Sequence, residues 1–98
     1  GLPQYVTENG MANDDRPGPD GSIADPQRIA YFEGHLEEIS QLVADGVPVR
    51  GYFAWSLLDN YEWPFSYNKR FGIVHVDYAT MARTPKDNYL GWRQALKR

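Results

Sequence analysis

The chain has 98 residues, a formal net charge of −3 and no cysteine, and 42% of its residues are hydrophobic. That length suits one small domain, and the weak negative charge argues against nucleic acid as a partner. The missing cysteine excludes a disulfide framework and a thiolate metal site, and it fits a reducing, cytoplasmic compartment. No apolar run is long enough to cross a membrane.

A short β-prone run at residues 4–7 predicts a strand with Glu8 at its carboxyl end. Gly10 then allows the chain to turn away without the steric cost of a Cβ atom. A carboxylate at the end of a strand is a candidate catalytic group. Its spacing alone, however, favours an ordinary exposed carboxylate in a loop.

Residues 11–23 are rich in turn-forming and helix-breaking residues and predict a loop. Asp14, Asp15 and Asp20 suggest a calcium loop, but their spacing lacks the EF-hand pattern and its closing glutamate. We therefore interpret this segment as a solvated loop without a metal.

A helix is predicted to begin at Asp25 and Pro26, which suit the N-cap and the first helical position. Gly46 is the predicted C-terminal cap. Apolar residues recur between these points at steps of three and four and form one stripe. The stripe consists of Ile29, Phe32, Leu36, Ile39, Leu42 and Val43.

Residues 49–55 are apolar on both faces except for Arg50, which is typical of a strand inside a parallel sheet. Together with the first strand and the helix, this strand predicts a right-handed βαβ unit. Phe53 is assigned to the core.

The strand at residues 49–55 runs into a polar loop with an unusual density of aromatic rings. The rings within twelve residues are Tyr52, Phe53, Trp55, Tyr61 and Trp63, with Asp59 and Glu62 among them. Rings can stack on a flat apolar ligand face while carboxylates bind its hydroxyl groups. The alternative interpretation is that the rings belong to the core.

The remaining segments carry less information about function. Residues 64–70 read as irregular and residues 73–78 as β-prone. A last helix is expected from Thr84 and Pro85, with Tyr89, Trp92 and Leu96 on one face. His35 and His75 are expected to be structural.

Five blocks of the chain resemble the C-terminal part of the family 1 glycoside hydrolases, the β-glucosidase and β-glycosidase group. Their order and spacing are similar to those of the family, and they cover nearly the whole chain. The blocks are residues 7–10, 51–63, 69–72, 76–78 and 83–87.

The resemblance implies a role for each candidate site residue. Glu8 matches the nucleophile of a retaining β-glycosidase. Trp55 matches the floor of the −1 sugar subsite, Glu62 the ligand of two sugar hydroxyls, and Trp63 and Phe71 further contacts to the same sugar. No cofactor or metal is implied, and both glucosides and galactosides remain possible substrates. The family also implies a cis peptide bond between Trp55 and Ser56.

The acid/base carboxylate of the family lies in an Asn-Glu-Pro motif, which this sequence lacks. Neither Asp59 nor Glu62 matches its position. A (β/α)₈ barrel needs roughly 250 residues, so residues 1–98 are expected to form one C-terminal segment of such a barrel, from strand 7 to helix 8, with a β-hairpin before the last helix. The segment is expected to be incomplete on its own.

The missing portion of the barrel is the expected partner, as a separate chain or a lost segment. Three hypotheses follow: a catalytic segment of a β-glycosidase, a non-catalytic sugar-binding or assembly fragment, and an unrelated small α/β binding domain. The third requires all five blocks to match by chance.

Overall fold

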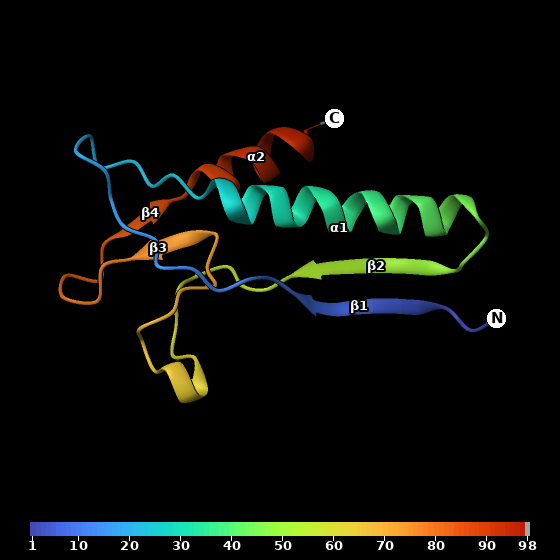
Figure 1. Ribbon diagram of the computed structural model, residues 1–98, viewed down its shortest axis with the longest axis horizontal. Coiled ribbons are helices and arrows are strands. Elements are labelled where there is room, and N and C mark those ends of the chain that lie inside the picture. Colours follow the sequence, from blue (N-terminus) through green and yellow to red (C-terminus); the bar gives the residue numbers. More distant parts are fainter. Residues whose placement is uncertain (98) are drawn as a thin grey trace.

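The computed structural model describes residues 1–97. The chain folds into an elongated α/β unit of 47 × 31 × 20 Å (Figure 1). Its elements in order are β1 (Gln4–Asn9), α1 (Pro26–Ala44), β2 (Val49–Ala54), the short 3₁₀ helix η1 (Trp63–Phe65), β3 (Val74–Val76), β4 (Arg83–Pro85) and α2 (Asp87–Ala95).

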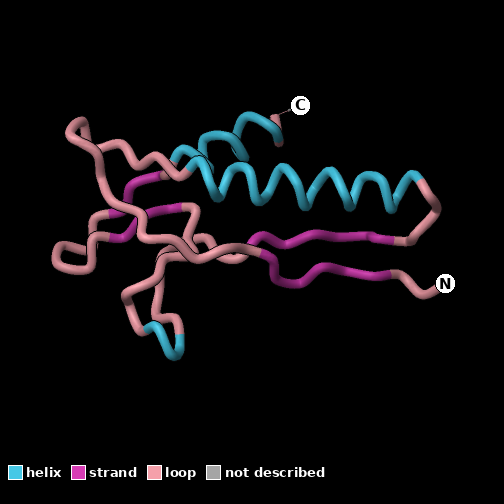
Figure 2. The backbone as a smooth tube through the Cα atoms, viewed as in Figure 1, coloured by secondary structure: helices cyan, strands magenta, loops and turns pink. Residues whose placement is uncertain are grey.

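The strands β1 and β2 form a parallel pair, and α1 is the crossover between them, so the predicted βαβ unit is confirmed. The ladder runs from Gln4 opposite Val49 to Asn9 opposite Ala54. Figure 2 shows α1 lying along this ladder, with the loops and the second sheet gathered at the end where β1 and β2 finish.

The helix α1 begins and ends where the sequence predicts, but its capping differs. Asp25 holds the N-cap position, yet its side chain makes no capping bond. Its carboxylate instead accepts hydrogen bonds from Arg28 and from the backbone N–H of Asn88. Gly46 has a φ of 89°, a conformation that glycine adopts without a Cβ penalty.

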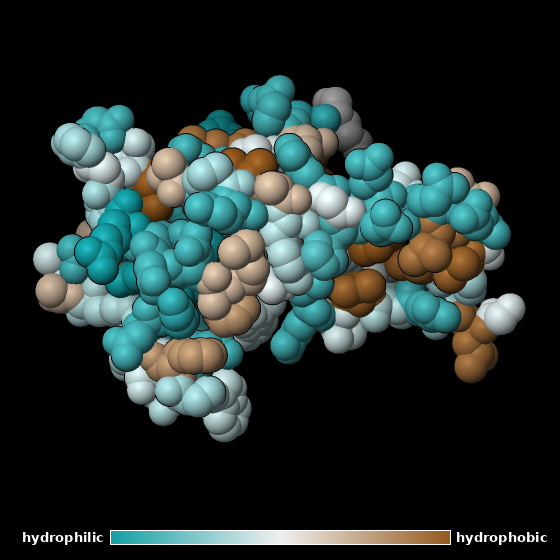
Figure 3. Space-filling model, viewed as in Figure 1, coloured by the Kyte–Doolittle hydropathy of each residue, from teal (hydrophilic) through white to brown (hydrophobic). Residues whose placement is uncertain are grey.

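The apolar stripe of α1 is buried only near its start. Phe32 is 3% exposed, whereas Leu42 and Val43 are 43% and 50% exposed. Figure 3 shows apolar side chains gathered at the end of the molecule where α1 ends and β1 begins. Phe53 in β2 is 59% exposed, so its assignment to the core was wrong for this chain.

The second sheet is an antiparallel hairpin of β3 and β4, which confirms the predicted hairpin. The predicted helix start at Thr84 and Pro85 was wrong. Both residues belong to β4, where they lie opposite His75 and Val74, and α2 begins at Asp87. Their pairing with β3 holds Thr84 and Pro85 in an extended conformation, and the helix starts only after this pairing ends.

The buried hydrophobic residues are Ile23, Phe32, Val74 and Val76. Ile23 lies before α1, Phe32 in α1, and Val74 and Val76 in β3. The helix α2 contacts both α1 and β4 and so connects the helix to the hairpin. No helix among residues 1–97 has both the length and the apolar character that a membrane crossing requires.

Candidate active site

The candidate nucleophile Glu8 lies at the carboxyl end of β1, as predicted, and is exposed. Since β1 and β2 are parallel, the chain leaves both strands at the same edge. The N–H of Trp55, directly after β2, donates to the carbonyl oxygen of Asn9 at 2.7 Å. Glu8 and Trp55 are therefore brought to one edge of the sheet by the strand pairing itself.

Gly10 is needed at this edge for a reason the sequence did not reveal. A Cβ atom on Gly10 would lie 1.8 Å from the carbonyl oxygen of Trp55, a distance that no side chain tolerates. Its role is to admit this close backbone approach between the two strand ends. The peptide bond between Trp55 and Ser56 is cis, as the sequence resemblance implied.

The side chain next to Glu8 fastens the end of β1 to its neighbours. Asn9 donates from Nδ2 to the hydroxyl of Tyr31 in α1 at 3.0 Å and accepts from the hydroxyl of Tyr52 in β2. Burial, with a smaller effect of Tyr31, raises the pKa of Tyr52 to about 12, so the phenol keeps its proton. Asn9, directly after Glu8, is thus anchored to both α1 and β2.

The other candidate sugar-binding residues lie on two further segments. Phe71 is half-buried, and its carbonyl oxygen accepts from the N–H of Ser56 at 3.2 Å, which attaches it to the Trp55 turn. Glu62 is half-buried, and Trp63 opens η1 with 78% of its surface exposed. Figure 1 shows this segment, in yellow, at the tip of a loop that extends away from β1 and β2.

The loop that carries Glu62 is closed by backbone bonds and aromatic contacts. The N–H of Glu62 donates to the carbonyl oxygen of Ser66 at 2.6 Å. Tyr61 and Tyr67 meet edge to face with ring centroids 5.5 Å apart, and Tyr67 and Tyr78 do so at 4.8 Å. The rings thus connect this loop to the segment that follows β3.

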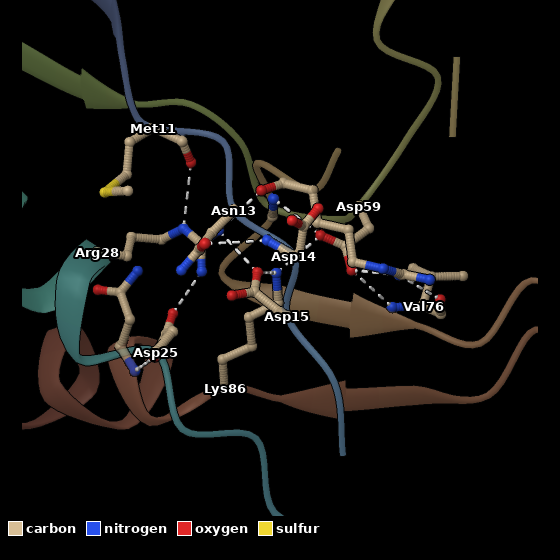
Figure 4. Close-up of polar contacts among 12 residues, drawn as sticks. Met11, Asn13, Asp14, Asp15, Asp25, Arg28, Asp59, Val76 and Lys86 are labelled. Carbon is tan, nitrogen blue, oxygen red and sulfur yellow. Dashed lines mark hydrogen bonds and ion pairs between the residues drawn. The ribbon is translucent and has the colours of Figure 1, made fainter. Parts of the chain in front are cut away.

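Sequence reasoning missed a row of buried ion pairs that joins the loop after β1, α1, the residues before β3 and the residue before α2. The row alternates in sign along Arg70, Asp59, Lys86, Asp15, Arg28 and Asp25 (Figure 4). Its nitrogen–oxygen distances lie between 2.6 and 2.8 Å. Apart from Arg70, whose side chain is 18% exposed, these side chains are at most 1% exposed.

The interpretation of residues 11–23 as a solvated loop was therefore wrong at Asp15. Asp14 and Asp20 are exposed as expected, but Asp15 is buried between Arg28 and Lys86. One signal was present in the sequence. Arg28 lies one helical turn before Phe32, so helical spacing places it on the buried face of α1, where a cation needs an acidic partner. Among residues 1–97, no group of His, Cys, Asp and Glu could hold a metal ion.

The environment of Asp59 explains why it is no candidate for a proton donor. Burial opposes its ionisation, but hydrogen bonds from Lys86 and Arg70 outweigh this effect and hold the pKa of Asp59 below its ordinary value. Its carboxylate is therefore ionised near neutral pH. His75 is buried in β3, and burial together with Arg70 lowers its pKa, which agrees with the expected structural role.

Comparison with known proteins gives the family. The profile described as glycosyl hydrolase family 1 matches residues 1–97. The 1,4-β-D-glucan glucohydrolase of Thermotoga neapolitana is 48% identical over 93 residues, which are 95% of this chain and 21% of that protein. β-Glucosidase 4 of Oryza sativa subsp. japonica is 48% identical over 96 residues, or 95% of this chain and 20% of that protein.

The solved structures agree with the sequences. The family 1 β-glucosidase of Thermotoga maritima superposes with a TM-score of 0.91 at 47% identity and covers 94% of this chain and 21% of its own. The same enzyme has been solved in complex with deoxynojirimycin and with galacto-hydroximolactam. The chain thus spans about a fifth of the length of the relatives it matches, and it belongs to glycosyl hydrolase family 1.

Proposed function

We propose that residues 1–98 are the segment from strand 7 to helix 8 of a retaining β-glucosidase with a (β/α)₈ barrel. The segment supplies the nucleophile and part of the −1 sugar subsite. The observation that carries this proposal is the parallel pairing of β1 and β2, which puts Glu8 and Trp55 at one edge, in a chain of this family. Active sites of such barrels form at the carboxyl ends of their strands.

In this mechanism Glu8 attacks the anomeric carbon of the sugar. A carboxylate oxygen of Glu8 forms the new bond to C1 while the bond from C1 to the leaving oxygen breaks. A second carboxyl group, outside this chain and about 5 Å from Glu8, gives the leaving oxygen its proton. The same group then takes a proton from water, whose oxygen attacks C1 and releases Glu8 as a carboxylate.

The remaining candidates bind the sugar. The indole of Trp55, 38% exposed, offers a face on which the C–H groups of a sugar stack. Glu62 accepts hydrogen bonds from two sugar hydroxyls, and charge-assisted bonds of this kind are strong. Trp63 contacts the same edge of the sugar, and Phe71 closes the pocket near the 6-position.

The substrate class is a terminal β-glucoside or a related β-glycoside. β-Glucosidases are among the relatives, and one relative from Bifidobacterium breve is described as a bifunctional β-D-glucosidase and β-D-fucosidase. Because a single carboxylate at Glu62 suits an equatorial or an axial O4, galactosides belong to the same class.

The remainder of the barrel is the proposed partner of this segment, in the same polypeptide or as a second chain. The alternative function is a non-catalytic sugar-binding or assembly piece. The mass of the native particle separates the two cases. A particle of about 11.2 kDa is the segment alone, whereas a particle several times heavier that carries an Asn-Glu-Pro motif is the enzyme.

The proposal is tested in a chimeric barrel, in which residues 1–97 replace the matching part of the Thermotoga maritima β-glucosidase. A 2-fluoro sugar with a good leaving group is expected to label Glu8 covalently. The electron-poor sugar slows both steps, but the good leaving group keeps the attack fast enough for the glycosyl-enzyme to accumulate. Mass spectrometry of the digested protein identifies the labelled peptide. Label on a peptide that contains Glu62 and lacks Glu8 would overturn the assignment.

The buried row of ion pairs gives a prediction about stability in the same chimeric barrel. Arg28→Met removes the cation between Asp15 and Asp25 and leaves two buried carboxylates undercompensated. The free energy of unfolding is expected to fall by about 3–5 kcal/mol, as measured by denaturant titration. Burial already raises the pKa of Asp25, and without Arg28 this carboxyl group binds a proton in the folded state more readily still. Protonation removes the buried charge, so the loss in free energy of unfolding is expected to become smaller as the pH falls.

Lys69→Met is the matched control for this prediction. It also removes a cation that pairs with an aspartate, Asp14, but these side chains are 37% and 59% exposed. Exposed ion pairs contribute about 0–1 kcal/mol, so the control should change the free energy of unfolding little. Equal losses in the two variants would show that burial does not decide the effect.

A further inference from the structure

The carboxylate of Asp59 is fully buried and saturated by hydrogen bonds. Its Oδ1 accepts from the N–H of Gly72 at 3.0 Å and from Nζ of Lys86 at 2.8 Å. Its Oδ2 accepts from Nη1 of Arg70 at 2.7 Å and from the N–H of Val76 at 3.2 Å. One side chain thus joins the segment before β3, β3 itself and the residue before α2.

The backbone of Asp59 packs closely against Gly72, and the residue after Asp59 is held by hydrogen bonds. A Cβ atom on Gly72 would lie 2.2 Å from the backbone nitrogen of Asp59, so the approach requires glycine. The next residue, Asn60, donates from Nδ2 to Oγ of Ser56 at 3.1 Å and to the carbonyl oxygen of Leu58 at 2.8 Å. These bonds fix the start of the loop that leads to Glu62 and Trp63.

The same cations also hold the segment that follows the Glu8 strand. Lys86 binds Asp15 at 2.6 Å as well as Asp59, and the backbones of Arg70 and Asn13 exchange two hydrogen bonds of 3.0 Å. In Figure 4 the side chains of Asp15 and Asp59 approach Lys86 from different segments. Arg70 and Lys86 therefore bridge the segment after Glu8 and the loop before Glu62.

We propose that Asp59, with Asn60 beside it, is a positioning residue that sets the place of Glu62 and Trp63 relative to Glu8. This inference rests on the proposed function. Asp59 touches no sugar in this role. It acts through the loop, because a side chain three residues ahead of Glu62 fixes where the loop starts and in which direction it leaves.

The test is Asp59→Asn in the chimeric barrel, with deoxynojirimycin as the probe. Isothermal titration measures both the dissociation constant and the number of binding sites per protein. The variant keeps the shape of the side chain but loses the charge that orders Arg70 and Lys86. We expect the dissociation constant of the sites that still bind to rise by about tenfold or more, which is the effect of one misplaced charge-assisted hydrogen bond.

Asp25→Asn is the matched control, because Asp25 is a fully buried carboxylate of the same row that binds Arg28 and the N–H of Asn88. A purely structural effect lowers the number of sites and leaves their dissociation constant unchanged, and we expect this result for the control. The same result for Asp59→Asn would overturn the positioning role.

Two further measurements keep the outcomes distinct. If Asp59→Asn fails to fold, Asn60→Ala is the variant to measure, since this half-buried residue holds the start of the same loop. An unchanged dissociation constant for Asn60→Ala would overturn the inference. Covalent labelling of the parent chimera is checked in parallel. A parent labelled away from Glu8 contradicts the proposed function, whereas a parent labelled at Glu8 with an unchanged Asp59→Asn dissociation constant contradicts the positioning role alone.

Discussion

Glu8→Gln in the chimeric barrel is expected to lower the turnover of an aryl β-glucoside by a factor on the order of 10⁴–10⁶, the range found when a hydrolase loses one of its catalytic residues. Glutamine keeps the size of the side chain and its place at the end of β1. Its amide oxygen carries no full charge, however, and cannot form a stable bond to C1. Folding should be unaffected because Glu8 is exposed.

The control is Glu37→Gln, which removes an exposed carboxylate from α1 and should leave turnover unchanged. A second experiment assigns the role of Glu8 by stereochemistry. In Glu8→Gly, azide should fill the vacated space and attack C1 from the side of the missing carboxylate. A product of inverted, α configuration is expected, and a β-glycosyl azide would mean that Glu8 is the acid/base instead.

The 98-residue chain by itself is expected to hydrolyse no aryl β-glucoside, even though this substrate needs little help from an acid. The chain lacks an Asn-Glu-Pro motif, and a ladder of two strands is only marginally stable alone. Within residues 1–97 the outer edges of β1 and β2 have no strand partner, and exposed strand edges promote aggregation. Large exposed apolar side chains, such as Phe53 and Trp63, add to this tendency.

The measurement combines an activity assay with a thermal melt at low protein concentration, and the chimeric barrel with the same residues is the positive control. We expect activity and a cooperative melt from the chimera and neither from the chain alone. Turnover by the 98-residue chain, verified by mass, would contradict the need for a second carboxylate. A sharp cooperative melt of its monomer would contradict the need for the remaining barrel strands.

The sequence alone determined the parts of the fold that depend on local pattern. Pro26 and Gly46 mark the limits of α1, because their backbone preferences act without distant partners. The apolar run at residues 49–55 indicated a strand of a parallel sheet, and the parallel pairing then required Glu8 and Trp55 to share one edge. The family followed from the spacing of motifs and was confirmed by the comparisons.

Other features were decided only by the tertiary structure, since they depend on partners far along the chain. Asp15 and Lys86 are 71 positions apart, and nothing near Asp15 distinguishes a buried aspartate from the exposed one beside it. Thr84 and Pro85 form a strand because they pair with β3. Gly10 is required by the carbonyl of Trp55. Local preferences are weak, and burial of charge and close backbone approach outweigh them once distant segments meet.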